Sequence, residues 1–199
     1  MGCAMKPTPT PTASPAAETW HSPPPTPPAS LPELIEVLSS YSAEARIGAA
    51  RALGAMGPDA EAAVPALANN LYYEGAHEVR RAAAWALGEI GPAARPAVPL
   101  LIVVLLDDSV HAREAAAIAL GKIQDPTAVP GLASSLDDQS QFVQVSSAEA
   151  LAQLTGQSFP GSPPSELGGY TLNESGEALI VLAASDWWKE EGWRQDWSH

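Results

Sequence analysis

Residues 79–92 read VRRAAAWALGEIGP, and this stretch decides the fold class. Its alanines, Leu87 and Ile90 recur at helical spacing, and the Gly91-Pro92 pair that follows is typical of a helix end. Three further segments repeat the pattern: EARIGAARALGAMG from Glu44, HAREAAAIALGKIQ from His111 and FVQVSSAEALAQLTG from Phe142. Four copies of one helical segment predict a tandem repeat.

Each copy completes a helix-turn-helix unit. The copies share a leucine, at steps of 34, 33 and 31 residues: Leu53, Leu87, Leu120 and Leu151. A shorter apolar segment precedes each copy and has a proline in its first turn, where the missing N–H costs nothing: Pro32, Pro65, Pro99 and Pro130. We therefore predict an all-α fold, an α-solenoid of four helix pairs over residues 31–157, divided into 31–61, 62–95, 96–126 and 127–157.

The pattern V-P-x-L, a gap, then V-R-x-x-A-A-x-A-L-G-x-I-G resembles the HEAT-like repeats of the phycobilin-lyase type. The match is nearly complete from Val79 to Gly91, whereas the fourth unit has Gln144 in place of arginine and Ala152 in place of glycine. The resemblance implies stacked helix pairs with an inner surface for binding, and an atypical last unit is expected beside a cap.

The same resemblance implies two enzymatic alternatives to a binding scaffold. One is a lyase or chromophore-handling protein, and the other is a metal-dependent hydroxylase that holds two irons on repeated His-Glu pairs. Only His77-Glu78 has the His-Glu form here, and a metal needs several convergent ligands. We therefore expect no metal site, no cofactor and no catalytic residues.

Composition narrows the class of partner. The chain has 199 residues, with 10 basic against 23 acidic side chains and a net charge of -13, which disfavours a nucleic acid. One cysteine excludes an internal disulfide, and no apolar run approaches the roughly 20 residues of a membrane span. We expect a monomer that binds another protein.

The repeats act as an internal alignment that separates packing positions from surface positions. Positions four and three before the shared leucine, and three after it, lie within about 60° of it on a helical wheel and form the predicted buried stripe. At the last of these positions stand Met56, Ile90, Ile123 and Leu154. Positions five and one before the leucine are also small throughout, as close packing of neighbouring helices requires.

Positions six and two before the leucine, and two after it, point away from the stripe and vary in residue type. This variable face holds Ile47, Arg51, Ala55, Arg81, Trp85, Glu89, Glu114, Ile118, Lys122, Val145, Glu149 and Gln153. Because Trp and Arg carry much of the energy in known interfaces, we predict a binding surface made of Arg51, Arg81, Trp85, Glu89, Glu114, Ile118, Lys122 and Glu149. Two alternatives stay open: the face varies because nothing restrains it, or Trp85 packs against a neighbouring repeat.

Arginine recurs seven residues before the shared leucine, at Arg46, Arg80 and Arg113. Acidic residues stand in the intervening turns: Glu74, Asp107 and Asp108. The spacing predicts a ladder of charge pairs that ties one unit to the next, with a bound anion as the alternative.

The two ends differ from the repeats. Residues 1–30 hold nine prolines and five threonines, which predicts a disordered leader or tether. Cys3 follows the small residue Gly2 and precedes a flexible Pro/Thr spacer, which resembles bacterial lipoproteins, so Cys3 is a candidate lipid anchor in the cell envelope and would be the mature first residue; a cytoplasmic protein with a free tail is the alternative. Residues 158–199 predict a loop and a Trp-rich capping helix whose tryptophans cover the end of the stack, with an aromatic ligand site as the alternative.

Overall fold

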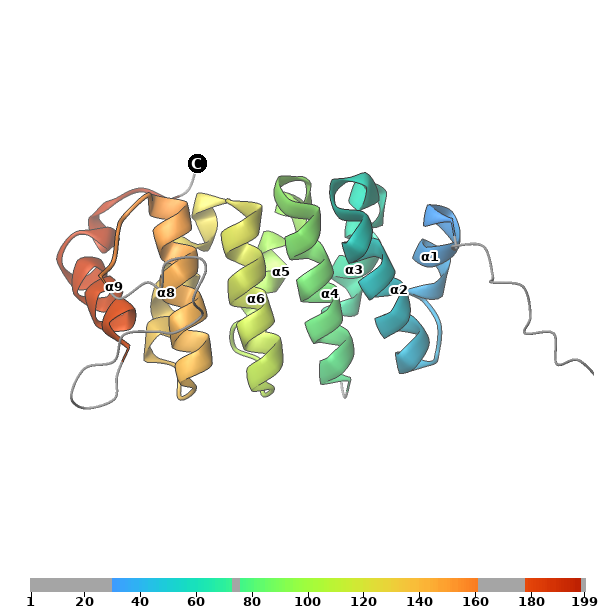
Figure 1. Cartoon of the computed structure of the whole chain (residues 1–199), viewed down its shortest axis with the longest axis horizontal. Coiled ribbons are helices and arrows are strands. Elements are labelled where there is room, and N and C mark those ends of the chain that lie inside the picture. The colour runs from blue at the N-terminus through green and yellow to red at the C-terminus, as the bar shows by residue number, and fades with distance from the viewer. Residues whose placement is uncertain (1–29, 73–75, 161–177, 198–199) are drawn as a thin grey trace, which may run out of the picture.

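The computed structural model describes residues 30–72, 76–160 and 178–197. Each repeat pairs a short first helix with a longer second helix. The first helices are α1 (Leu31–Val37), α3 (Val64–Asn70), α5 (Val98–Val104) and α7 (Val129–Ser134). The second helices are α2 (Ala43–Met56), α4 (His77–Ile90), α6 (Val110–Ile123) and α8 (Gln141–Thr155). Figure 1 shows the second helices side by side in one row, so the predicted α-solenoid is confirmed.

Short 3-10 turns and a final helix complete the stack. The turns are η1 (Gly57–Ala63), η2 (Gly91–Ala97), η3 (Pro126–Ala128), η4 (Ser135–Asp137) and η5 (Gly192–Arg194). Gly57 and Gly91 end α2 and α4 with φ values of 59° and 74°, which a side chain would disfavour. In the third repeat Gln124 takes the left-handed conformation instead, and the side chain of Asp125 accepts a hydrogen bond from the Thr127 amide at 2.9 Å. The helix end predicted at Gly91-Pro92 is therefore confirmed.

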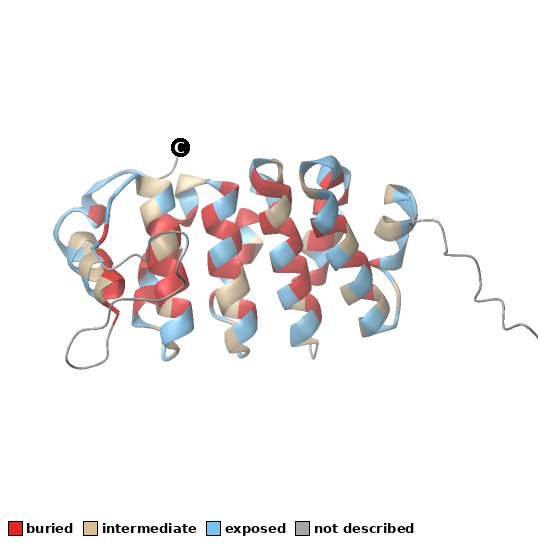
Figure 2. Cartoon of the chain, viewed as in Figure 1, coloured by how far each residue is buried: buried red, intermediate tan, exposed pale blue. Residues whose placement is uncertain are grey.

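The core runs the length of the solenoid between the two rows of helices (Figure 2). All four shared leucines are fully buried, and so are the alanines that precede them by three positions. The predicted buried stripe is incomplete in the first and last repeats, where Met56 is 36% exposed and Leu154 is only half-buried. A terminal repeat has a neighbouring repeat on one side only, so the same position loses part of its cover there.

The cap is α9 (Leu179–Glu190), which packs against α8. It buries Ile180 and Ala184, and the ring of Trp187 lies 5.8 Å from that of Phe159, measured between centroids. Trp187 also contacts the rings of Trp188 and Trp197. All three tryptophans are partly buried and pack against the hydrophobic core at this end of the stack.

One continuous helical stretch, His77–Val104, is long and apolar enough to cross a membrane by length and composition alone. The composition had not led us to expect a run of this length. The stretch passes through α4, η2 and α5, and the chain changes direction at Gly91. Half of its most apolar part is buried inside the protein, so packing within the solenoid accounts for its apolar character.

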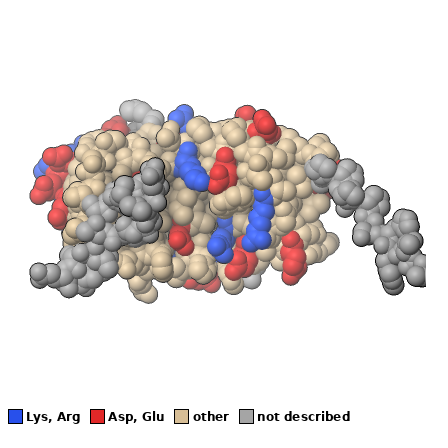
Figure 3. Space-filling view, viewed as in Figure 1, with Lys and Arg blue, Asp and Glu red and all other residues tan. Residues whose placement is uncertain are grey.

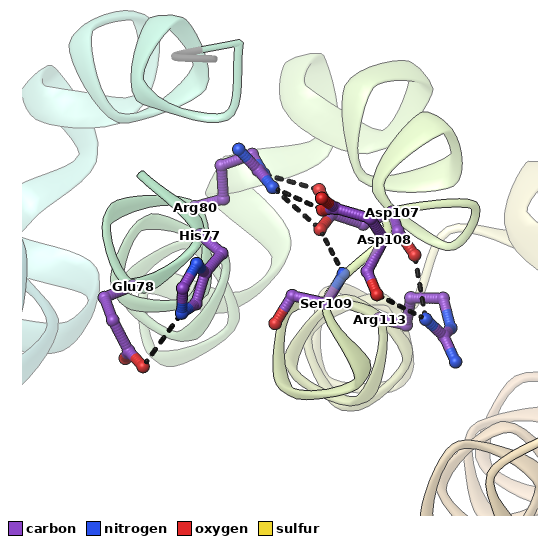
Figure 4. Close-up of polar contacts among 7 residues, drawn as sticks. All are labelled: His77, Glu78, Arg80, Asp107, Asp108, Ser109 and Arg113. Carbon is purple, nitrogen blue, oxygen red and sulfur yellow. Dashed lines mark hydrogen bonds and ion pairs between the residues drawn. The ribbon is translucent and has the colours of Figure 1, made fainter. Parts of the chain in front are cut away.

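The predicted charge ladder is present between repeats two, three and four. Figure 4 shows its first part, in which Arg80 contacts Asp107 and Asp108. Arg80 donates to Asp107 at 2.9 Å and to Asp108 at 2.9 Å, and Arg113 donates to Asp138 at 2.7 Å through Nε and 2.9 Å through Nη2. In each pair the arginine belongs to one repeat and the carboxylate to the next. Glu74, the expected partner of Arg46, lies outside the described residues.

The arginine position has a second role that also explains Gln144. Arg46 donates to the Ser40 carbonyl at 2.6 Å, Arg113 to that of Asp107 at 2.8 Å, and Gln144 to that of Asp138 at 2.7 Å. Each bond ties the second helix to the turn before it in the same repeat. Glutamine keeps this bond but has no charge for a carboxylate, and in the described part of the chain the helix that packs on the far side of α8 is α9 rather than another helix pair.

The ladder changes the pKa of its members. The hydrogen bond to Asp107 raises the pKa of Arg80, and that to Asp138 raises the pKa of Arg113. Burial pushes the pKa of Asp138 up, but hydrogen bonds from Arg113 and the Ser140 amide outweigh it and leave that pKa below its usual value. The pKa of Asp107 is lowered in the same way, against burial. Both aspartates therefore stabilise the folded state in their charged form.

Candidate binding cleft

A cleft of about 430 Å³ opens between α4 and α6 on the face formed by the second helices. Its floor consists of small residues from the packing positions, among them Ala82, Gly88 and Ala119. A Cβ atom at Gly88 would lie 2.9 Å from the Ala119 Cα, so the two backbones approach closely under the cleft. Trp85 and Ile118 rise from this floor, because they occupy the variable position that points away from the core.

The ring of Trp85 leans over Gly54 in the preceding repeat. A Cβ atom at Gly54 would lie 2.4 Å from Cζ3 of the indole, so only glycine leaves room for the ring there. Trp85 still has 38% of its surface exposed. The neighbouring repeat thus covers one part of the ring, while the rest borders the cleft.

Charged side chains surround this apolar centre. Lys122 pairs with Glu89 at 2.6 Å and joins α6 to α4. Arg81 lies 3.7 Å from Glu78, and the Nδ1 atom of His111 lies 3.9 Å from Glu114. Figure 3 shows basic side chains gathered over α2, α4 and α6, the helices that carry Arg51, Arg81 and Lys122.

The cleft brings together six of the eight residues predicted to bind: Arg51, Arg81, Trp85, Glu114, Ile118 and Lys122. Glu89 reaches the site only through its pair with Lys122, and Glu149 on α8 is half-buried and does not line the cleft. Val145 was predicted to lie on the same exposed face but is buried. The helix that carries it, α8, packs against the cap as well as against α6, unlike the internal second helices.

Sequence reasoning missed Glu78 and His111, which also line the cleft. Both stand nine positions before the shared leucine, which is about 180° from it on the helical wheel. Continuing the wheel by one more turn would have found them. Cys3, the predicted lipid anchor, lies outside the described residues.

Within the described ranges, no group of three or more His, Cys, Asp or Glu residues is placed to hold a metal ion. His77 lies 3.5 Å from Glu78 at the start of α4, and both are exposed. Figure 4 shows the side chain of Glu78 pointing away from the Arg80 ladder, with His77 between Glu78 and Arg80.

These features define an α-solenoid with a cleft on its row of second helices. The family model for HEAT repeats matches residues 24–88 and 71–152, and the chain belongs to this family. No curated protein matches the chain.

Solved structures share the fold. The complex of CpcE and CpcF of phycocyanin lyase from Nostoc sp. PCC7120 is 28% identical with a TM-score of 0.55, over 72% of this chain and 71% of that one. An engineered protein from a structural genomics consortium is 26% identical with a TM-score of 0.54, over 62% of each chain. A designed armadillo repeat protein, at 21% identity and a TM-score of 0.54 over 62% of this chain and 64% of that one, resembles this chain in fold. The match therefore spans less than two thirds of the engineered and designed proteins.

Proposed function

We propose that this HEAT-repeat protein is a non-catalytic scaffold that binds another protein through the cleft between α4 and α6. The observation that carries the proposal is the exposed part of Trp85, which lines the cleft together with Ile118, above a floor of small residues and among charged side chains. A large aromatic side chain in an apolar pocket with a polar rim is the usual centre of a protein interface.

The test is a quantitative pull-down from the source cell extract with the native protein, Trp85→Ala and Ile118→Ala. Phe142→Ala is the matched control, because Phe142 is an exposed aromatic residue on α8 that does not line the cleft. Truncating a central interface residue typically costs about 2 kcal/mol, or roughly 30-fold in affinity. We expect the cleft variants to lose a partner that the control retains; equal recovery from all four proteins would reject the cleft.

A second candidate is a lyase or chromophore-handling protein, and the likeness to the phycocyanin lyase complex favours it. A bilin has an apolar ring system and carboxylate groups, which Trp85 and the basic rim could accommodate. Purified protein titrated with a bilin would decide through the absorbance of the bilin and through its dependence on Trp85→Ala. An unchanged absorbance spectrum removes this candidate.

A further inference from the structure

The unpaired charge beside the cleft points to the chemistry of the partner. Three basic residues line the cleft, and two of them have carboxylates nearby: Lys122 has Glu89 at 2.6 Å, and Arg81 has Glu78 at 3.7 Å. Arg51 is exposed and makes no hydrogen bond or ion pair with any residue that the structure describes. A partner therefore meets an uncompensated positive charge at this side of the cleft, although the chain as a whole carries a net charge of -13.

The carboxylates of the cleft do not cancel this charge. Glu114 lies 3.9 Å from His111, and Glu78 lies beside Arg81. Glu78 thus has a cationic neighbour on α4, whereas His111 balances Glu114 only when its imidazole is protonated; Glu114 lies on α6, however, and α4 separates it from Arg51 on α2. The local field that an approaching segment meets first at α2 is consequently that of Arg51.

The position of Arg51 sets a spacing. Arg51, Trp85 and Ile118 all stand two residues before the shared leucine, so they form one row across α2, α4 and α6, the neighbouring helices of Figure 1. Packed helices lie about 8–10 Å apart, and an extended chain advances about 3.3 Å per residue. The centre of the cleft, between α4 and α6, is therefore about four to five extended residues from Arg51.

We propose that the partner is an extended protein segment with one acidic and one large apolar residue about four to five residues apart. Its Asp or Glu side chain pairs with Arg51, and its apolar side chain enters between Trp85 and Ile118. This rests on the proposed function, since it specifies what the same cleft binds. The carboxylate gives orientation along the row of helices, and the apolar side chain gives most of the affinity.

The experiment is selection of short linear peptides from a random phage-displayed library on the purified full chain. Enriched peptides are then synthesised and their binding is measured by fluorescence polarisation. We expect enrichment of an acidic residue at this distance from a large apolar one. Arg51→Glu should weaken such peptides about tenfold, because an ion pair is replaced by a repulsion.

Arg95→Glu is the matched control, since it makes the same change in charge at an exposed arginine of η2 outside the cleft. It should change affinity by less than about twofold. Trp85→Ala and, as a second variant, Ile118→Ala should abolish binding while circular dichroism shows that each protein remains folded.

The outcomes separate the two proposals. Enriched peptides that lack acidic residues, or that bind Arg51→Glu as well as the native protein, overturn the acidic partner while their loss on Trp85→Ala keeps the protein-binding cleft. Peptides that bind Trp85→Ala and Ile118→Ala unchanged overturn both proposals. A bilin that binds the native cleft when no peptide is enriched also overturns both and favours chromophore handling.

Discussion

Three glycines of the second helices differ in what a methyl group would meet, and this gives a graded test of the packing. An added Cβ atom meets nothing within 4 Å at Gly48. At Gly54 it meets the edge of the Trp85 ring at 2.4 Å, and at Gly88 it meets the Cα atom of Ala119 at 2.9 Å. The same substitution therefore probes open solvent, a movable side chain and a fixed backbone.

The expected free energies of unfolding follow from these neighbours. Replacing a helical glycine by alanine gains about 0.5–1 kcal/mol from helix propensity, and at Gly48 nothing opposes this gain. At Gly88 the methyl group must push α4 away from α6, and overpacking of this kind costs about 1–3 kcal/mol. At Gly54 the half-exposed ring can swing outward, so loss of its packing and the helical gain nearly cancel, to within about 0.5 kcal/mol.

Urea denaturation followed by far-ultraviolet circular dichroism measures these differences. We expect Gly48→Ala to be the most stable, Gly54→Ala to resemble the native protein and Gly88→Ala to be the least stable. The helical gain is common to both, so the gap between the first and last variants should equal the overpacking cost, about 1–3 kcal/mol, with an unchanged denaturant slope. Equal stability of Gly88→Ala and Gly48→Ala would refute the close approach of α4 and α6.

Three further outcomes follow from the ladder and the cap. Arg113→Gln keeps a hydrogen-bond donor for the turn, as in the fourth repeat, but loses the ion pair with Asp138, so we expect urea unfolding to show a loss of stability of about 2 kcal/mol. The control Lys122→Gln removes an exposed ion pair and should cost less than about 1 kcal/mol; equal costs would contradict the ladder. Because the folded pKa of Asp138 is lowered, its stabilisation is complete above the unfolded pKa near 4 and is lost as the pH falls through the folded pKa. Asp138→Asn should therefore flatten the acid limb of stability, and an unaltered acid limb would argue against this pairing. Truncation after Gln157 removes α9 and should cause aggregation on size-exclusion chromatography; a soluble, monomeric fragment that melts cooperatively would disprove the capping role.

Periodicity within one helix predicted the fold and most of the cleft, because it determines the direction in which each side chain points. Leu87 and its neighbouring alanines followed from it, and so did the outward direction of the positions that hold Trp85 and Ile118. Periodicity does not determine what the next helix places opposite. Met56 and Val145 were misplaced for that reason, since both lie in terminal repeats whose neighbours differ from those of the internal repeats.

The contact of Trp85 with Gly54 could not be predicted from the sequence for the same reason. It joins two repeats and depends on the distance between them. The glycine looked like part of the shared packing pattern, as it is at Gly88, where the partner is an alanine. Between α2 and α4, the residue that packs on Gly54 is instead the indole ring of Trp85. A helical wheel gives the direction of Trp85 but does not show which helix the ring leans on.

The lean of Trp85 toward α2 also accounts for the position of the cleft. Because Gly54 accepts the ring, the space between α4 and α6 stays open next to Ile118. Gly54→Ala should push the ring out of its seat over α2 and toward that space, so it should weaken a selected peptide about tenfold or more while unfolding as the native protein does. Gly48→Ala, on the same helix, should leave peptide affinity unchanged. Unchanged peptide affinity in Gly54→Ala would mean that the packing of the Trp85 ring on Gly54 does not determine the form of the cleft. A partner would then contact only the exposed edge of Trp85.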